Sequence, residues 1–316
     1  MKKLLALIAT AMVALTLTAP ATVFAEQKHF SIVTTIFPIY DWVRQIIGDR
    51  EAEVTMLMDS GVDLHNFQPT AQDILTIAQC DLFIFVGGES DEWTEDVLKT
   101  AQNESLTVID LLDALGEDVK EEEIVEGMEA EEEEGEEEEA DEHVWLSLRN
   151  AQKLVGVIAE ALSGIDPENA GLYQANAEGY GEKLQALDAQ YAEMANTAAY
   201  KTILFGDRFP FRYLADDYGL TYYAAFAGCS AETEASFQTI LFLAQKVDEL
   251  SLPAVLTIEN PKTRIAETVV NATQSRNQKI LSLNSMQGVT RRDAQAGASY
   301  LGIMEENLRV LRDALN

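Results

Sequence analysis

The sequence is poor in cysteine, histidine and basic residues. Its 316 residues include two Cys, three His and 22 Lys plus Arg, against 54 Asp plus Glu, for a formal net charge of −32. Clustered Lys and Arg are needed to neutralise nucleic-acid phosphates, so this composition disfavours a nucleic-acid-binding protein. The negative charge favours cations as partners instead.

The common local signatures of catalysis are also missing. There is no Cys-x-x-Cys or His-Glu-x-x-His zinc pattern, no Gly-x-Ser-x-Gly nucleophile elbow and no glycine-rich phosphate loop. We therefore expect a protein that is not an enzyme. A secreted metallohydrolase is kept as an alternative, because two histidines and an acid can hold a catalytic zinc.

Only one long apolar run is present, at the N-terminus. Lys2 and Lys3 precede apolar residues from Leu4 to Leu15, and Val23-Phe24-Ala25 forms a small-x-small cleavage site. The run is shorter than the roughly 20 residues of a membrane span, so we interpret residues 1–25 as a signal peptide. No cysteine follows the run for lipid attachment. We expect an exported, soluble monomer in the periplasm or on the extracellular side of the cytoplasmic membrane.

Cys80 and Cys229 are the only cysteines. In an oxidising compartment they are a disulfide candidate. The alternative is two buried thiols that pack as small apolar side chains. One bridge would not define the fold of a chain of this length.

An acidic segment interrupts the middle of the chain. Residues 121–142 contain 15 acidic residues and no Lys or Arg. Like charges at this density repel one another, so we expect a solvated, disordered insertion. Two interpretations stay open: an inert loop that aids solubility, or a collector that binds cations weakly. The second would make the protein an extracellular cation buffer.

Strand-like and helix-like runs alternate on both sides of this segment, which is typical of parallel sheets covered by helices. The run Asp81–Val86 is apolar throughout after its first residue, as in a buried strand, and residues 167–194 keep helical spacing over about five turns. The predicted fold class is α/β: an N-terminal lobe (26–165), one long linking helix (166–196) and a C-terminal lobe (197–316), with mainly parallel sheets. The expected strands are Phe30–Thr35, Glu53–Leu57, Asp81–Val86, Thr107–Asp110, Thr202–Phe205, Thr221–Phe226, Ala254–Ile258 and Lys279–Leu283.

Two of the three histidines lie in loops. His65 lies between an expected strand and a helix capped by Thr70, and His143 precedes the first long apolar helix, whereas His29 is expected to be incidental. Ligands gather beyond the carboxyl ends of strands in open α/β sheets, so His65 and His143 are candidates for one shared metal site.

The sequence motifs around these histidines resemble those of the zinc/manganese-binding solute-binding proteins of ABC transporters. The segment Gly61-Val62-Asp63-x-His65-x-x-x-Pro69-Thr70 is similar to their first ligand loop, and Glu142-His143-Val144-Trp145-Leu146 is similar to their second. Phe209-Pro210-Phe211-Arg212-Tyr213-Leu214 resembles the segment after their third ligand. The resemblance covers nearly the whole mature chain and implies two α/β lobes bridged by a rigid helix.

The same resemblance places the third and fourth ligands at Arg208 and Asn284. A guanidinium has no lone pair to offer a cation, and an amide oxygen is a poorer zinc ligand than a carboxylate. The acids that could replace these ligands are Asp207, Glu232, Glu234 and Glu259. Arg208 could instead pair with one of these acids and lock the two lobes together.

The resemblance thus implies the substrate-binding component of a metal ABC transporter. It would capture Zn²⁺, or as a second choice Mn²⁺, between the lobes and deliver it to a membrane permease. The metal candidates are His65, His143, Asp207, Asn284, Glu234 and Glu259. Imidazole must be deprotonated to bind, so we expect uptake to weaken below roughly pH 6.

Overall fold

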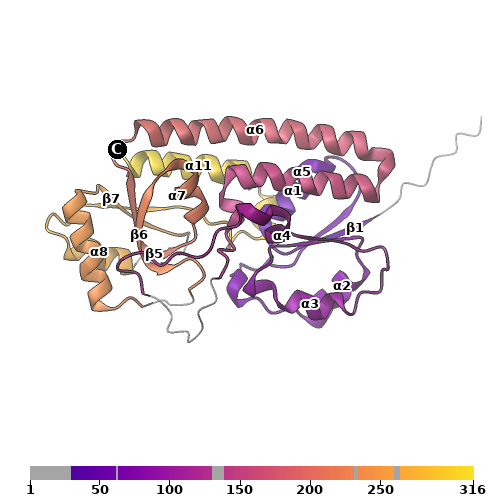
Figure 1. Ribbon diagram of the computed structural model, residues 1–316, viewed down its shortest axis with the longest axis horizontal. Helices are drawn as coiled ribbons and strands as arrows, with labels where there is room; N and C mark the ends of the chain where they lie inside the picture. Colours follow the sequence, from indigo (N-terminus) through magenta and orange to yellow (C-terminus); the bar gives the residue numbers. More distant parts are fainter. Residues whose placement is uncertain (1–29, 62, 130–138, 231–233, 260–263) are drawn as a thin grey trace, which may run out of the picture.

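A computed structural model describes residues 30–61, 63–129, 139–230, 234–259 and 264–316. Within them the chain forms two four-stranded parallel sheets, each flanked by helices, with one long helix running along both (Figure 1). This confirms the predicted α/β class. The expected signal peptide (1–25) and His29 lie outside the described residues.

The first sheet has the strand order β2-β1-β3-β4. Its third strand is the apolar run that the sequence marks as buried, and all four of its residues are inaccessible. Each strand is followed by a helical segment, which is the connection that parallel neighbours require. The strands are β1 (Ser31–Thr34), β2 (Glu53–Met56), β3 (Leu82–Phe85) and β4 (Thr107–Asp110); the helices between and after them are α1 (Phe37–Ile47), α2 (Ala71–Gln79), α3 (Trp93–Leu98) and α4 (Leu111–Leu115).

The second sheet repeats this arrangement in the order β6-β5-β7-β8. Its strand β5 is longer than the sequence predicted and continues to Phe209, with a register irregularity between Phe205 and Arg208. The strands are β5 (Thr202–Phe209), β6 (Thr221–Ala227), β7 (Ala254–Thr257) and β8 (Lys279–Ser282); the accompanying helices are α7 (Arg212–Tyr218), α8 (Phe237–Leu250), α9 (Arg264–Ala272), α10 (Arg291–Gln295) and α11 (Tyr300–Ala314).

Two long helices connect the sheets. Helix α5 (Leu148–Ile165) packs its apolar stripe into the core, and α6 (Ala170–Thr197) runs antiparallel to it after a short 3-10 turn. The buried side chains of α6 recur every three or four residues from Tyr173 to Met194, so a single face of the helix lines the core of both lobes.

The C-terminal helix α11 also contacts both halves. The backbone N–H of Tyr300 donates to Asp41 of α1, and the Tyr300 hydroxyl donates to the carbonyl of Trp145. Midway along α11, the carbonyl of Met304 accepts from the buried hydroxyl of Tyr191 in α6. The two sheets are therefore held by α6 and α11 together. The boundaries at residues 165 and 196 stay a prediction.

The edges of the acidic segment are ordered, so the expectation of a wholly disordered 121–142 insertion is wrong for the residues described. Residues 121–129 and 139–142 form an antiparallel bridge between Glu121 and Ala140 and a bridge from Glu129 to Phe226 of β6. Residues 121–129 thus lie along the second lobe, which provides donors for the carboxylates of Glu122, Glu123 and Glu129. Residues 130–138 lie outside the described part of the chain.

Among the described residues, no helix combines the length and the apolar character that a membrane crossing needs.

Candidate metal centre

His65 lies in the turn that follows β2. The turn is a 3-10 segment, Leu64–Asn66, and its N-cap residue Asp63 accepts a hydrogen bond from the backbone N–H of His65. Thr70 then caps α2 through a complete capping box with Asp73, as the sequence predicted. Both ends of this loop are therefore fixed, which holds the imidazole in one orientation.

His143 lies just before α5. The backbone N–H and ring Nδ1 of His143 both contact Asp141 Oδ1 at 2.9 Å, and the histidine is completely buried. The carboxylate can only accept, so the ring carries its hydrogen on Nδ1 and has a lone pair on Nε2. Carboxylate-oriented imidazoles of this kind are typical of metal-ligating histidines.

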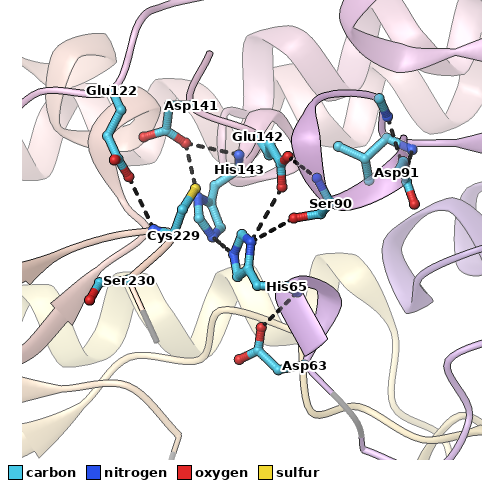
Figure 2. Close-up of polar contacts among 12 residues, drawn as sticks. Asp63, His65, Ser90, Asp91, Glu122, Asp141, Glu142, His143, Cys229 and Ser230 are labelled. Atoms are coloured by element: carbon cyan, nitrogen blue, oxygen red, sulfur yellow. Dashed lines mark hydrogen bonds and ion pairs between the residues drawn. The ribbon is translucent and has the colours of Figure 1, made fainter. Parts of the chain in front are cut away.

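The two predicted histidines meet at this point (Figure 2). Their Nε2 atoms are 3.4 Å apart, although the residues are separated by 78 positions in the sequence. His65 Nδ1 lies 2.7 Å from Ser90 Oγ and 3.4 Å from Glu142 Oε2, and its Nε2 faces His143. Two nitrogens bound to one tetrahedral zinc at 2.0–2.1 Å are about 3.3 Å apart. The observed separation fits one shared cation.

Glu142 holds Ser90 in place beside His65. Its Oε1 accepts a hydrogen bond of 2.8 Å from the backbone N–H of Ser90, the residue that contacts His65. Gly88 makes this approach possible: its φ is +79°, and a Cβ there would lie 2.5 Å from Glu142 Oε1. Burial raises the pKa of the Glu142 carboxyl above its ordinary value.

The surroundings keep the imidazole of His65 neutral. Burial, followed by the neighbouring His143, lowers the pKa of His65 from 6.5 to about 3. A neutral imidazole is the form that binds metals, so the histidine is prepared for a cation before one arrives.

Trp145 closes one side of the pair. Its ring centroid is 5.2 Å from that of His143, and its indole N–H donates at 2.8 Å to the carbonyl of Ser285 in the second lobe. The residue is fully buried. It excludes water from that side of His143 and joins the first lobe to the second.

Arg208 occupies the position where the family resemblance implied a third ligand. Its guanidinium forms an ion pair with Asp63 of the first lobe and contacts the carbonyl oxygen of Ser230. Although burial would raise the Asp63 pKa, the positive charge of Arg208 holds it below its ordinary value. Arg208 thus pairs with an acid and links the two lobes, as expected. The acid is Asp63, however, and not one of the four that the sequence suggested.

The structure does not bring the remaining predicted ligands into this centre. Asp207 accepts from the backbone N–H groups of Arg208 and Ile258, and burial raises its pKa. Glu259 accepts from the N–H and hydroxyl of Ser285.

Two further predicted metal ligands, Asn284 and Glu234, also lie outside this centre. Asn284 accepts from the backbone N–H of Met286 and so holds its own turn together. Glu234 is exposed just before α8, and its neighbour Glu232 lies outside the described residues.

Cys229, which was not among the predicted ligands, lies beside the two histidines. Sγ of Cys229 and a ring nitrogen of each of His65 and His143 all lie within 4.8 Å of one another. Cys80 and Cys229 are both free, so the structure contradicts the disulfide candidate. The alternative of a buried thiol holds for Cys80, whereas Cys229 is partly exposed. Burial and the nearby Asp141 raise the pKa of the Cys229 thiol. The only local signal was its position just after a strand, beside a glycine.

Two parallel-sheet lobes, a long helix along both, and a pair of imidazoles where the lobes meet define a two-lobed solute-binding fold. Such a site offers neutral nitrogen donors in a buried, acid-rich environment, which suits capture of a divalent cation.

Residues 32–314 match the family model described as "Zinc-uptake complex component A periplasmic", and the chain belongs to this family. That description is of an uptake component and not of an enzyme. The chain is 33% identical over 316 residues to the zinc-binding lipoprotein AdcA of Streptococcus pneumoniae. It is 31% identical over 290 residues to the high-affinity zinc uptake system protein ZnuA of Bacillus subtilis, covering 90% of this chain and 87% of that protein.

The solved structures agree with the fold. The Zn(II)-bound ZnuA-like domain of Streptococcus pneumoniae AdcA matches with a TM-score of 0.71 at 30% identity, covering 91% of this chain and 99% of that domain. The match to full-length AdcA involves 99% of this chain but 61% of AdcA. The chain therefore spans about three fifths of the length of that relative.

Proposed function

We propose that this chain is the extracytoplasmic substrate-binding component of a metal ABC transporter. It captures Zn²⁺ between its two lobes through His65 and His143 and delivers the ion to a membrane permease. The observation that carries the proposal is the 3.4 Å separation of the two Nε2 atoms. His143 Nδ1 contacts Asp141, which favours a lone pair on its Nε2, the form of imidazole that binds a cation.

Family membership supports the same function, because relatives along nearly the whole chain are named for zinc binding or zinc uptake. The two histidines and Cys229 belong to one chain, so metal binding requires no second copy, and we propose that the protein acts as a monomer. Helices α6 and α11 hold both lobes, so we expect metal binding to move the lobes only slightly.

The free-buffer alternative is weakened by the acidic segment itself. Glu122 accepts from the N–H of Cys229, Glu123 accepts from the hydroxyl of Tyr222, and Glu129 accepts from Thr239. These carboxylates are engaged with the second lobe, so they are poorer collectors of loosely bound cations than a solvated run would be.

The test is a zinc titration of the purified protein against a chromophoric chelator. We expect one tightly bound Zn²⁺ per chain, with each of His65→Ala and His143→Ala weakening binding by about 100-fold or more. His29→Ala, the remaining histidine, is the matched control and should leave the affinity unchanged. Several weak sites that survive both histidine substitutions would overturn the proposal in favour of a buffer.

Coupling to a permease is tested in the source organism. Deleting the gene should slow growth in chelator-treated medium, and added zinc should restore it. Wild type should complement the deletion, whereas His143→Ala should not. Equal complementation by both would argue against delivery through this site.

A further inference from the structure

Cys229 approaches the histidine pair from the opposite lobe. It follows β6 in the second lobe, whereas both histidines belong to the first, and Figure 2 shows the thiol beside the ring of His143. Since one ligand atom of each residue lies within 4.8 Å of the other two, the three side chains form one cluster.

The backbone is shaped for this approach. A Cβ at the preceding residue, Gly228, would lie 2.9 Å from the carbonyl oxygen of Phe209 and 3.0 Å from Cε1 of His143. Only glycine therefore lets the loop come this close to the imidazole. The N–H of Cys229 donates to Glu122 Oε1 at 3.1 Å, which fixes the loop from the acidic segment.

The second lobe offers few other donors at this point. Arg208, at the position of the implied third ligand, cannot bind a cation and is engaged with Asp63. Asp207 uses both carboxylate oxygens for backbone N–H groups. Among the described His, Cys, Asp and Glu side chains of the second lobe, Cys229 alone joins the two histidines in a metal-ligating group.

We propose that Cys229 is the third metal ligand, supplied by the second lobe in place of the residue lost at Arg208, and that it makes the site select thiophilic cations such as Zn²⁺ and Cd²⁺ over Mn²⁺. The inference rests on the proposed function of the same site. It adds which residue of the second lobe holds the ion and which class of ion the site accepts.

The donor chemistry supports this selectivity. Two imidazole nitrogens and a thiolate form a set that suits zinc, whereas Mn²⁺ prefers carboxylate, carbonyl and water oxygens. With Zn–S near 2.3 Å and Zn–N near 2.0–2.1 Å, the sulfur and each nitrogen would be about 3.6 Å apart. The 4.8 Å limit on the observed separations means that closing around the ion requires a shift of at most about 1.2 Å of the thiol.

The binding step balances without a further reactant. One Zn–S bond forms, the S–H bond breaks, and the thiol proton is released to solvent. Three buried or partly buried acids, Asp141, Glu142 and Glu122, surround the sulfur. Their negative charge disfavours a bare thiolate but favours the same thiolate once a dication is beside it.

Cobalt(II) reports directly on sulfur ligation. We expect the Co²⁺-loaded wild type to show a thiolate-to-cobalt charge-transfer band in the near ultraviolet, and Cys229→Ser to lack it. Cys80→Ser is the matched control. Cys80 is buried just before the first residue of β3, and its thiol donates to the carbonyl of Ile77. That variant should keep the band.

Affinity gives the second readout. Cys229→Ser should weaken Zn²⁺ and Cd²⁺ binding by about 100-fold or more and change Mn²⁺ binding by less than about threefold. Cys229→His should recover much of the zinc affinity without the charge-transfer band, which a merely structural role for the cysteine would not produce. If Cys229→Ser unfolds, protection of Cys229 in the wild type from iodoacetamide by Zn²⁺ supplies the same answer.

The outcomes separate the two proposals. A Cys229→Ser variant that keeps zinc affinity, or wild-type Cys229 that alkylates equally with and without zinc, overturns the role of Cys229. If His65→Ala still loses zinc in that case, the proposed function stands. A wild type that binds no zinc would overturn both.

Discussion

Arg208 of β5 and Asp63 of the first lobe form an ion pair across the two lobes, next to the histidine pair. Both side chains are largely buried, with 15% and 20% of their surface exposed. Asp63 also accepts from the N–H of His65. One carboxylate therefore connects the second lobe to the turn that carries a proposed metal ligand.

Breaking this pair should destabilise the protein. We expect Asp63→Ala and Arg208→Ala each to lower the free energy of unfolding by about 1–3 kcal/mol, since each leaves a charged partner without its hydrogen bond. The double variant should cost less than the sum of the single ones. Urea unfolding of the metal-free proteins measures all three.

The exposed pair Arg309–Glu306 is the control for that cycle, and its removal should cost less than about 1 kcal/mol. Strictly additive effects of Asp63→Ala and Arg208→Ala would show that the two charges do not stabilise each other.

Replacing the carboxylate behind His143 should weaken metal binding without unfolding the chain. In Asp141→Asn, the acceptor for the Nδ1–H of His143 becomes neutral, so the imidazole is a weaker donor and its tautomer is less fixed. We expect zinc affinity to fall by about 10–100-fold in a chelator competition. Asp96→Asn, at an exposed aspartate, should have no effect. Equal affinity for Asp141→Asn and wild type would contradict this account.

The metal-free protein should lose stability in acid partly through His65. Its pKa is lowered to about 3 in the fold by burial and by His143, against 6.5 in the unfolded chain. Below pH 6.5 the unfolded chain therefore takes up a proton that the folded one does not. The free energy of unfolding falls by up to about 1.4 kcal/mol per pH unit from this group until pH approaches 3.

Urea unfolding in the presence of a chelator, between about pH 6.5 and pH 4, measures this loss. The loss should be smaller for His65→Gln, which has no such proton to exchange. Parallel curves for the two proteins would rule out a buried, neutral His65. The shifted pKa also revises the sequence-based expectation that proton competition begins near pH 6, because at His65 it begins far lower.

Glu129, in the N-terminal part of the acidic segment, should contribute to the stability of the fold. Glu129 Oε1 accepts from the N–H of Ser236 and the hydroxyl of Thr239, at the start of α8. Glu129→Ala should therefore cost about 1.5–3 kcal/mol of unfolding free energy, as expected for lost hydrogen bonds to a charged group. Glu126→Ala, at a glutamate whose side chain is 74% exposed, should change little. If both variants melt at the wild-type temperature, the segment is not part of the fold.

Much of the fold could be predicted because its signals are local. Strands β3 and β7 are continuous apolar runs, and Thr70 and Gly219 mark helix ends through side-chain capping and a left-handed backbone. The prediction went wrong where long-range contacts overrule local composition. A charge-dense run looks solvated, but donors from β6 and α8 pair with its carboxylates.

The site divides in the same way. His65 and His143 were predicted as metal ligands because each lies in a loop with a recognisable sequence motif. Asp207 and Glu259 lie outside the cluster of His65, His143 and Cys229, and their oxygens accept from backbone N–H groups, which no sequence pattern reveals. Cys229 was missed because a single cysteine after a strand carries no ligand spacing of its own.

The sequence by itself determined the two α/β halves, the long helix between them and the identity of the two histidines, because periodicity, capping and short motifs act over a few residues. Only the tertiary structure decided which second-lobe side chain meets these histidines. That choice depends on the packing of β5 and β6 against the first lobe, which turns Arg208 toward Asp63 and brings Cys229 to the imidazoles.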